Sequence, residues 1–210
     1  MAVNTDSLRV TGAITHTNDF RPPLDPGQIA QRTLQEYVID LTQCRIHDNF
    51  GVVLPNAGAT DDLGLVGGTF GTNAPSLQTE DLKAAGATLN YAAFTFALPP
   101  EYVAGETVVV RFKAGMITNV ADTNATLDIA CYSNDEDNSV SADLASAAVS
   151  DNMNALVASI ATIDFTITAT ALSPGSVLNV RVSTSVNDAA TGTAVVGCIT
   201  KISVLCDTQG

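Results

Sequence analysis

Groups that could carry out catalysis are scarce in this sequence of 210 residues. A nucleophilic triad needs a histidine placed to accept a proton, and the histidines of this chain are His16 and His47. His16 lies in a stretch without regular periodicity, His47 lies at the end of a predicted strand, and no GxSxG motif accompanies either. Because these groups are missing, we predict that the protein is not an enzyme.

Sugar chemistry would need a different set of groups. Glycoside hydrolysis uses two carboxyl groups across a cleft, and the 22 acidic residues of the chain could form many such pairs. A sugar cleft usually also presents exposed aromatic rings. The chain has no tryptophan, four tyrosines and seven phenylalanines, and most of them fall at inward positions of the predicted strands. This pattern disfavours a typical carbohydrate-binding platform.

The densest anionic cluster is the loop 133–138, where Asp135 and Asp137 are candidate ligands for a hard cation such as calcium. The loop departs from the EF-hand pattern, because Ser139 stands at a ligand position and Val140 replaces the glycine. We therefore interpret it as a solvated acidic turn and predict neither a metal nor a cofactor.

The four cysteines lack a CxxC pair and lie in apolar, strand-like runs. Cys198 and Cys206 would lie about 26 Å apart on one extended strand, at about 3.3 Å per residue, which is too far for a disulfide. Free cysteine is among the most buried residue types. We therefore predict reduced core thiols at Cys44, Cys131, Cys198 and Cys206.

The elements that must position these groups follow a β pattern from residue 36 onward. Apolar and polar residues alternate in short runs, which prolines and glycines separate. This pattern predicts an all-β, antiparallel, eight-stranded jelly-roll β-sandwich in which the first and last strands pair in one sheet. The predicted strands are 36–46, 89–98, 106–114, 125–132, 140–149, 161–169, 176–185 and 194–206. The alanines of 140–149 also suit a helix, and 151–158 suits a short helix between layers.

The connection over residues 48–86 lacks strong periodicity, which is unusual at this length within one domain. Three interpretations remain open: it carries function, it covers an edge strand, or it contains short strands. Its glycines only loosely suggest a phosphate-binding loop, because no lysine or helix pattern follows them, and we interpret it as a flexible loop. These glycines are Gly64, Gly67, Gly68 and Gly71.

The first part of the chain has no sustained period. Three prolines and a glycine fall within residues 20–27 and exclude a helix or a central strand there. We predict an extended N-terminal arm over residues 1–35 and a jelly-roll β-sandwich domain over residues 36–210.

Charge is distributed unevenly along the chain. The formal net charge is −13, which disfavours nucleic acid as a direct partner. Up to Arg45 there are four basic and five acidic residues, and beyond it five basic and seventeen acidic ones. This suits an arm that lies on a partner and a body that faces solvent.

No secretory signal pattern and no apolar run of about 20 residues is present, so we expect cytosolic synthesis and no membrane partner.

Three stretches, 81–106, 172–176 and 199–207, together with the strand spacing, resemble the capsid decoration (cement) proteins of tailed phages. The resemblance covers about the last 170 residues. It implies a structural virion protein on the capsid exterior, made in the host cytoplasm, that forms a homotrimer and binds the lattice of the major capsid protein. No catalytic residue is carried over.

On this interpretation the arm provides much of the attachment. Its candidate partner-binding residues are Phe20, Arg21, Pro22, Pro23, Leu24 and Arg32. The alternative from another class is a receptor- or glycan-binding β-module of a phage tail or fibre, and a small glycan hydrolase comes third.

Overall fold

Two antiparallel sheets form this protein. The computed structural model describes residues 32–82, 86–118, 124–134, 137–188, 192 and 194–209. Residues Leu34–Thr208 form the unit to which the following description applies. Its elements in chain order are β2 (Arg32–Ile39), η2 (Leu41–Gln43), β3 (Gly64–Gly67), β4 (Pro75–Gln78), β5 (Gly86–Ala97), β6 (Val108–Thr118), β7 (Ala125–Ser133), β8 (Ile160–Ile167), β9 (Val177–Asp188) and β10 (Val196–Gln209).

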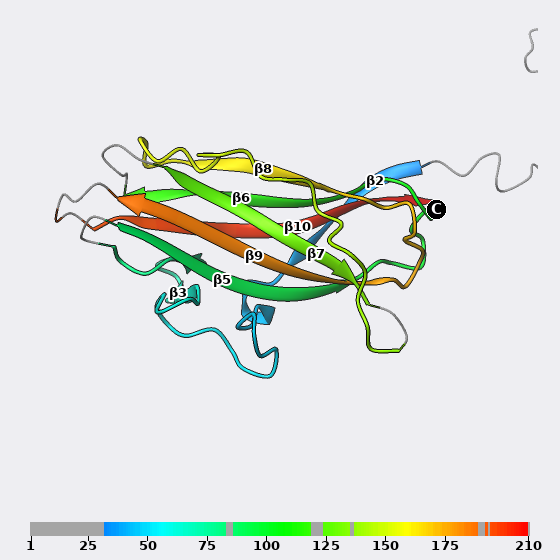
Figure 1. The fold of residues 1–210 in the computed structure, drawn as a ribbon, viewed down its shortest axis with the longest axis horizontal. Coiled ribbons are helices and arrows are strands. Elements are labelled where there is room, and N and C mark those ends of the chain that lie inside the picture. Colours follow the sequence, from blue (N-terminus) through cyan, green and yellow to red (C-terminus); the bar gives the residue numbers. More distant parts are fainter. Residues whose placement is uncertain are drawn as a thin grey trace, which may run out of the picture. The chain divides into compact units, whose positions relative to one another are not determined.

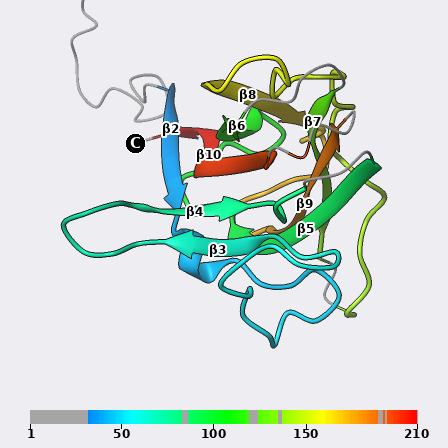
Figure 2. The same cartoon turned by 90° about the vertical axis from the view of Figure 1, so that its left-hand side faces the viewer.

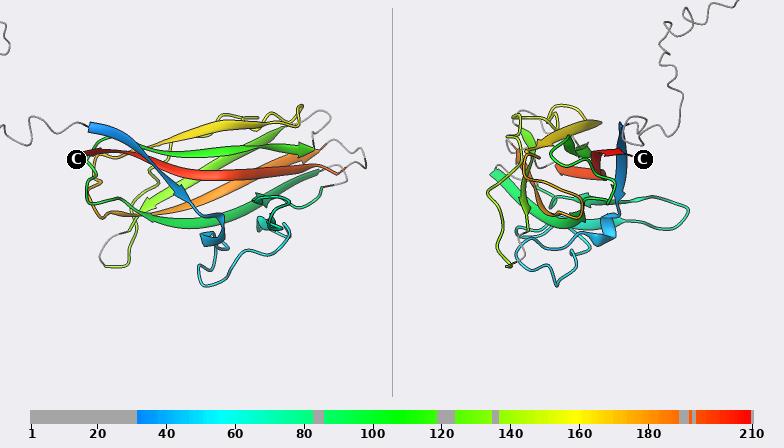
Figure 3. Two further views of the ribbon diagram at one scale, coloured as in Figure 1. Left: turned by 180° about the vertical axis from the view of Figure 1, so that it is seen from behind. Right: turned by 90° about the vertical axis from the view of Figure 1, so that its right-hand side faces the viewer.

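The sheets are connected as in a jelly roll. One sheet has the order β3-β4-β10-β6-β8, with β2 also paired to β10, and the other has the order β5-β9-β7 (Figure 1). From β5 onward the chain changes sheet at every connection. Figure 3 shows β2 running beside β10, so the first and last predicted strands are neighbours. The all-β, antiparallel sandwich is thereby confirmed, whereas the extended arm before residue 32 lies outside the described residues.

The core lies between the two sheets and consists of alternate residues of each strand. Every second residue of β9, from Leu178 to Asp188, is buried, and the residues between them are partly or fully exposed. Phe112 and Phe165 are buried and meet edge to face, with ring centroids 5.9 Å apart. This alternation confirms the predicted inward faces and leaves the other face of each sheet to loops or solvent.

Cys44, Cys131 and Cys206 belong to this core, whereas Cys198 is buried outside it. All four are free and buried, as predicted. Burial raises the pKa of Cys44 and Cys131 to about 12, and that of Cys198 and Cys206 to about 11. The thiols are therefore uncharged at neutral pH.

The strand predicted over 140–149 is not formed. An irregular segment bonds to both sheets instead: the Leu144 N–H donates to the Cys131 carbonyl of β7, and the Ser146 N–H donates to the Thr166 carbonyl of β8, at 2.8 and 2.9 Å. A segment that moves from one sheet to the other within three residues cannot keep a ladder with either.

The strand predicted over 36–46 also ends early, at Ile39. The Asp40 carboxylate accepts a hydrogen bond from the Thr42 N–H at 2.9 Å and caps the short turn η2. A capping carboxylate at this position satisfies the N–H of Thr42, the second residue of the turn, and stops the extended backbone.

Helical structure is limited to short turns in the described residues. The helix considered over 151–158 is replaced by turns in which Asp151 and Asn154 adopt φ values of 56° and 49°. Such values are incompatible with a right-handed helix. No helix of the described residues is both long and apolar enough to cross a membrane.

The connection over residues 48–86 contains two short strands and also covers sheet edges. Strand β4 pairs with β10 at Cys198 and Ile199, and β3 pairs with β4 to form a hairpin (Figure 2). Before the hairpin, Arg45 forms an isolated bridge with Ala93 of β5, and Asp62 forms one with Tyr91. Two of the three interpretations of this connection are therefore correct.

The outer edge of β7 is satisfied largely by side chains. Every second N–H of this strand points away from β9, and each finds a side-chain oxygen at 2.8 to 3.0 Å. The acceptors are Asp151, Asn152, Asp128, Asp143 and Ser141, which serve Ala125, Leu127, Ile129, Cys131 and Ser133 respectively. An edge closed in this way offers no template for another strand.

We predict that Asp143→Ala lowers the free energy of unfolding by about 1–2 kcal/mol, because the Cys131 and Ala145 N–H groups both lose their acceptor. Asp143→Asn keeps an acceptor oxygen and should retain most of the stability. Urea denaturation measures both variants. Equal loss in the two would show that charge, and not the acceptor, is what matters at this position.

Candidate functional site

The predicted partner-binding residues are not brought together by the described structure. Phe20, Arg21, Pro22, Pro23 and Leu24 lie outside the described residues. Arg32 is exposed and begins β2, so the strand starts within the region predicted as the arm, which extended to residue 35. Residues 32–36 are all exposed, so this part of β2 has no burial pattern that the sequence could reveal, and pairing with β10 accounts for the strand.

The two candidate metal ligands, Asp135 and Asp137, are likewise not brought together by the described structure. Asp135 lies outside the described residues, and Asp137 accepts a hydrogen bond from the Ser139 N–H at 3.0 Å. Hydrogen bonds from Ser139 lower the pKa of Asp137. Within the described ranges, no group of three or more His, Cys, Asp or Glu side chains is placed to hold a metal ion.

A more promising set of residues lies on the outer face of β5-β9-β7. Strand pairing aligns its outward side chains in rows across the sheet, and the two central rows are Ala93–Arg181–Ala130 and Thr95–Asn179–Tyr132. Because the residues beside Arg181 on the two neighbouring strands are alanines, little side-chain volume covers the sheet around it. A hollow therefore forms where a long cationic side chain and a carboxamide stand side by side.

Residues 45–53 fold over this face. Arg45 and Ala93 exchange two backbone hydrogen bonds of 2.8 Å, which fix the start of the segment on the edge of β5. The Ile46 N–H then donates to the Val52 carbonyl, and the Val52 N–H donates to the Asn49 carbonyl. The result is a tight turn that carries Phe50 at its tip.

Together these elements enclose a pocket of about 260 Å³. His47 and Phe50 line it from residues 45–53, Tyr132 lines it from the end of β7, and Val140 lines it from the segment that follows. The β5 and β9 residues that complete the lining are Ala93, Asn179, Val180 and Arg181. Phe50 is 45% exposed, so an aromatic ring of the pocket remains open to solvent.

Tyr91 supports the pocket from the neighbouring row. Its ring stacks against His47 with centroids 4.4 Å apart, and the Arg181 guanidinium carbon lies 5.1 Å from its centroid. This cation–π contact fixes the guanidinium against the sheet. No carboxylate of the described residues forms an ion pair with Arg181, so its N–H groups remain able to bind a ligand.

Asn179 contributes the other polar group. Its side-chain NH₂ group donates to the Asn134 side-chain oxygen, and the side-chain oxygen of Asn179 remains an acceptor. The pocket therefore combines apolar ring surfaces with donors and an acceptor. Such a set can bind an amphipathic, uncharged molecule, whose ring or chain lies against the aromatic groups.

Residues 45–63, here called the covering segment, have a second anchor on β5 in the Asp61–Leu63 stretch. The Tyr91 N–H donates to the Asp61 carbonyl at 2.7 Å, and the Leu63 N–H donates to the Tyr91 carbonyl at 2.8 Å. Asn90, fully buried, donates to the carbonyls of Thr60 and Asp62 at 3.4 Å. These contacts hold the segment at both ends, so that His47 and Phe50 lie over the sheet.

The anchoring places carboxylates close together. Burial and the neighbouring carboxylates of Asp61 and Asp48 raise the pKa of Asp62, although His47 opposes the shift. Charge repulsion within the covering segment is thus a cost of this arrangement at neutral pH.

Sequence analysis did not identify this pocket, and it placed the aromatic residues mainly in the core. Alternation contained a usable signal, because the even positions of β7 and the odd positions of β9 face outward together. Tyr132, Asn179 and Arg181 follow from that signal. No signal in the sequence indicated which loop covers them.

Comparison with known proteins leaves the family open. No protein-family model matches the chain, and no curated protein matches it. Several solved structures are similar to it at low identity.

The CBM22-1 xylan-binding domain of Paenibacillus barcinonensis Xyn10C is 12% identical, with a TM-score of 0.39, over 83% of this chain and 97% of that one. The xylan-binding module CBM15 is 15% identical, with a TM-score of 0.43, over 83% and 97% of the two chains. The Stig cyclase Fisc of Fischerella sp. TAU is 13% identical, with a TM-score of 0.40, over 88% and 91%. At these values the similarities assign no function to this chain.

We predict that Asp62→Asn raises the urea midpoint at pH 7. The pKa of Asp62 is higher in the folded than in the unfolded state, so the folded state binds the proton more tightly, and stability falls as pH rises through the interval between the two values. The variant removes this loss. Its advantage should disappear at about pH 3, below the ordinary pKa of aspartate.

Asp137→Asn is the matched control, because it changes the net charge equally but removes a carboxylate whose pKa is lowered. It should not raise the midpoint at pH 7. A rise of equal size in both variants would assign the effect to net charge.

Proposed function

We propose that this chain is a non-catalytic binding module for neutral carbohydrate, with its binding face on the outer side of β5-β9-β7. One observation carries the proposal: a single pocket combines the rings of His47, Phe50 and Tyr132 with the Arg181 guanidinium and the Asn179 carboxamide. The apolar C–H faces of a sugar ring lie well against aromatic rings, and its hydroxyl groups need donors and acceptors beside them.

Charge favours a neutral ligand. The chain has a formal net charge of −13, and Asp48, Asp61 and Asp62 lie in the segment that covers the pocket. An anionic polysaccharide would be repelled at long range. A neutral glycan would meet no such barrier.

The pocket lining supports binding without catalysis. Among the described residues that line it there is no carboxylate, whereas most glycoside hydrolases place two carboxyl groups across the scissile bond. His47 stacks on Tyr91, and its Nδ1 atom is buried without a hydrogen-bond partner. The ring of His47 thus contributes surface to the site.

Calorimetric titration of the whole chain with neutral xylo-, gluco- and manno-oligosaccharides tests the proposal. We expect binding to at least one series. Tyr132→Ala and Phe50→Ala should each weaken it about 5- to 30-fold, as expected for loss of about 1–2 kcal/mol of aromatic contact. Arg181→Ala should weaken it as well.

Ser185→Ala is the matched control, since Ser185 lies on the same strand and face as Arg181 but does not line the pocket. It should bind as the parent does. The proposal is wrong if no neutral glycan binds, and the binding face is wrong if affinity is unchanged in the Tyr132 and Phe50 variants.

A structural role on a phage capsid is our second proposal. The charge distribution supports it, because the part of the chain up to Arg45 is nearly neutral while the remainder has twelve more acidic than basic residues. A neutral segment can lie against a partner that the acidic body would not approach.

Deletion of residues 1–31, which stops short of β2, tests this second role. Cryo-electron microscopy would measure the occupancy of the truncated protein on capsids stripped of it. We expect occupancy to fall strongly, because Phe20, Arg21, Pro22, Pro23 and Leu24 are removed while the sandwich stays intact. Full occupancy would contradict attachment through the arm.

A further inference from the structure

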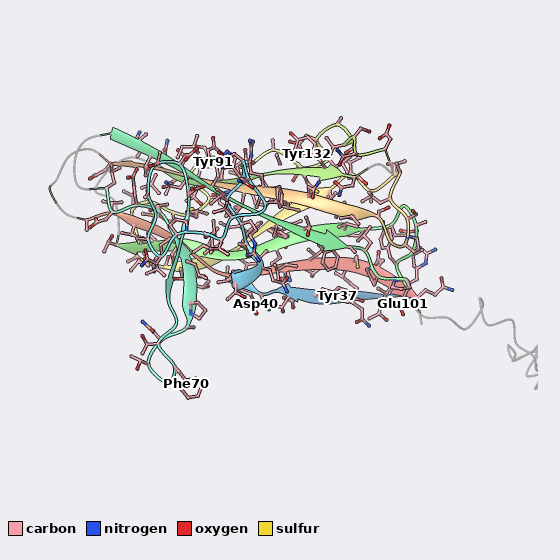
Figure 4. All side chains as sticks on the ribbon, turned by 90° about the horizontal axis from the view of Figure 1, so that it is seen from below. Tyr37, Asp40, Phe70, Tyr91, Glu101 and Tyr132 are labelled. Carbon is pink, nitrogen blue, oxygen red and sulfur yellow. The ribbon has the colours of Figure 1, made fainter. Side chains whose placement is uncertain are left out.

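The hairpin β3–β4 holds an aromatic side chain in solvent. Figure 2 shows the turn of the hairpin extending beyond the two sheets, and Figure 4 shows Phe70 at its tip. Phe70 is 102% exposed, as much as a residue in an extended peptide. It therefore makes no contribution to the core of its own chain.

The turn that carries Phe70 has a defined conformation. The Thr69 N–H donates to the Asn73 side-chain oxygen at 2.9 Å, and the Thr72 N–H donates to the Thr69 carbonyl at 2.9 Å. Gly67, Gly68 and Gly71 have φ values of 84°, 85° and 76°, which side-chain-bearing residues rarely adopt. The turn backbone is thus held by its own hydrogen bonds, so little backbone order would be lost on binding.

A groove that suits this ring lies elsewhere on the same chain. It has a volume of about 430 Å³ and is formed by β4, β6, β10 and residues 158–160. Met116 and Cys198 are buried in it, while Ile117 and Ile160 are 46% and 44% exposed at its rim. Pro75, which pairs with Gly67 where the hairpin turn begins, also lines it, yet the exposure of Phe70 shows that the ring does not occupy this groove in its own chain.

The hairpin and the groove share a second property, which is the absence of charge. Residues 64–79 contain no charged side chain, and neither do residues 154–163. None of the residues that line the groove is charged. Two copies that each carry a net charge of −13 repel one another over most of their surfaces, and they can approach most closely where neutral, apolar surface meets neutral, apolar surface.

We propose that the chain self-associates head to tail, with Phe70 of one copy inserted into the groove lined by Met116, Ile117 and Ile160 of the next. The two surfaces are different parts of the same chain, so the contact is heterologous. Such contacts form a closed ring when the rotation between copies closes, and a filament when it does not.

Sedimentation velocity of the full chain at concentrations up to about 100 μM, where a micromolar contact is populated, tests the proposal. We expect the parent to associate. Phe70→Ser should raise the dissociation constant at least about 30-fold, which is typical of a central aromatic anchor. Ile160→Lys, which places a charge on the groove rim, should do the same. Val149→Ser is the control, because Val149 is 74% exposed and lies outside the groove.

Mixing the two deficient variants provides the decisive measurement. The Phe70→Ser chain has an intact groove and the Ile160→Lys chain has an intact Phe70, so the mixture should form one-to-one pairs that grow no further. Circular dichroism establishes that each variant is folded. A monomeric parent, a Phe70→Ser variant that associates as the parent does, or a mixture that stays monomeric would overturn the proposal.

Discussion

The three-stranded sheet has two edges, and at each edge backbone N–H and C=O groups need partners that no further strand supplies. On β7 these partners are side-chain oxygens, including those of Asp143 and Asp151. On β5 they are the backbones of Arg45 and Asp61, which the chain brings back to Ala93 and Tyr91. Much of the irregular structure between the strands follows from this requirement, because the connecting segments go where unpaired groups must be satisfied.

The same requirement builds the pocket. The segment that satisfies β5 carries His47 and Phe50 over the outer face of the sheet, and the segment after β7 carries Val140 to the opposite side. Edge bonding is therefore what turns an open sheet face into a hollow with aromatic walls. The six-stranded sheet meets the problem differently: β10 is bordered along part of its length by β4 and also pairs with β2. Strand β3 joins this sheet through β4, and the turn between them presents Phe70.

Alternation in the sequence predicted the sandwich well, because a strand with one buried face has a period of two. The inward positions of Phe94, Val180 and Cys131 follow from it directly. Alternation did not predict the segment after β7, where side chains such as Asp143 accept hydrogen bonds from the N–H groups at the sheet edge, because such bonding does not recur every two residues. It also failed at β3, whose four residues include two glycines. The pocket combines both situations: alternation places Tyr132 and Arg181 outward, but the contact that brings Phe50 to them is long-range and depends on two backbone anchors.

Strand order also constrains how the molecule can assemble from an unfolded chain. Because β5 to β10 alternate between sheets, no two of these strands that are adjacent in sequence pair with each other, and each ladder joins segments far apart in the chain. Strand β10 lies inside its sheet, where it borders β6 and also pairs with β2 and β4. That sheet therefore lacks its interior until residues 196–209 take part. Chains dominated by such non-local pairing fold slowly, on the order of milliseconds to seconds. Until β10 docks, the backbone groups on the β10 side of β6 lack partners and part of the inner face of β5-β9-β7 stays uncovered, so a partly synthesised chain would depend on protection from aggregation.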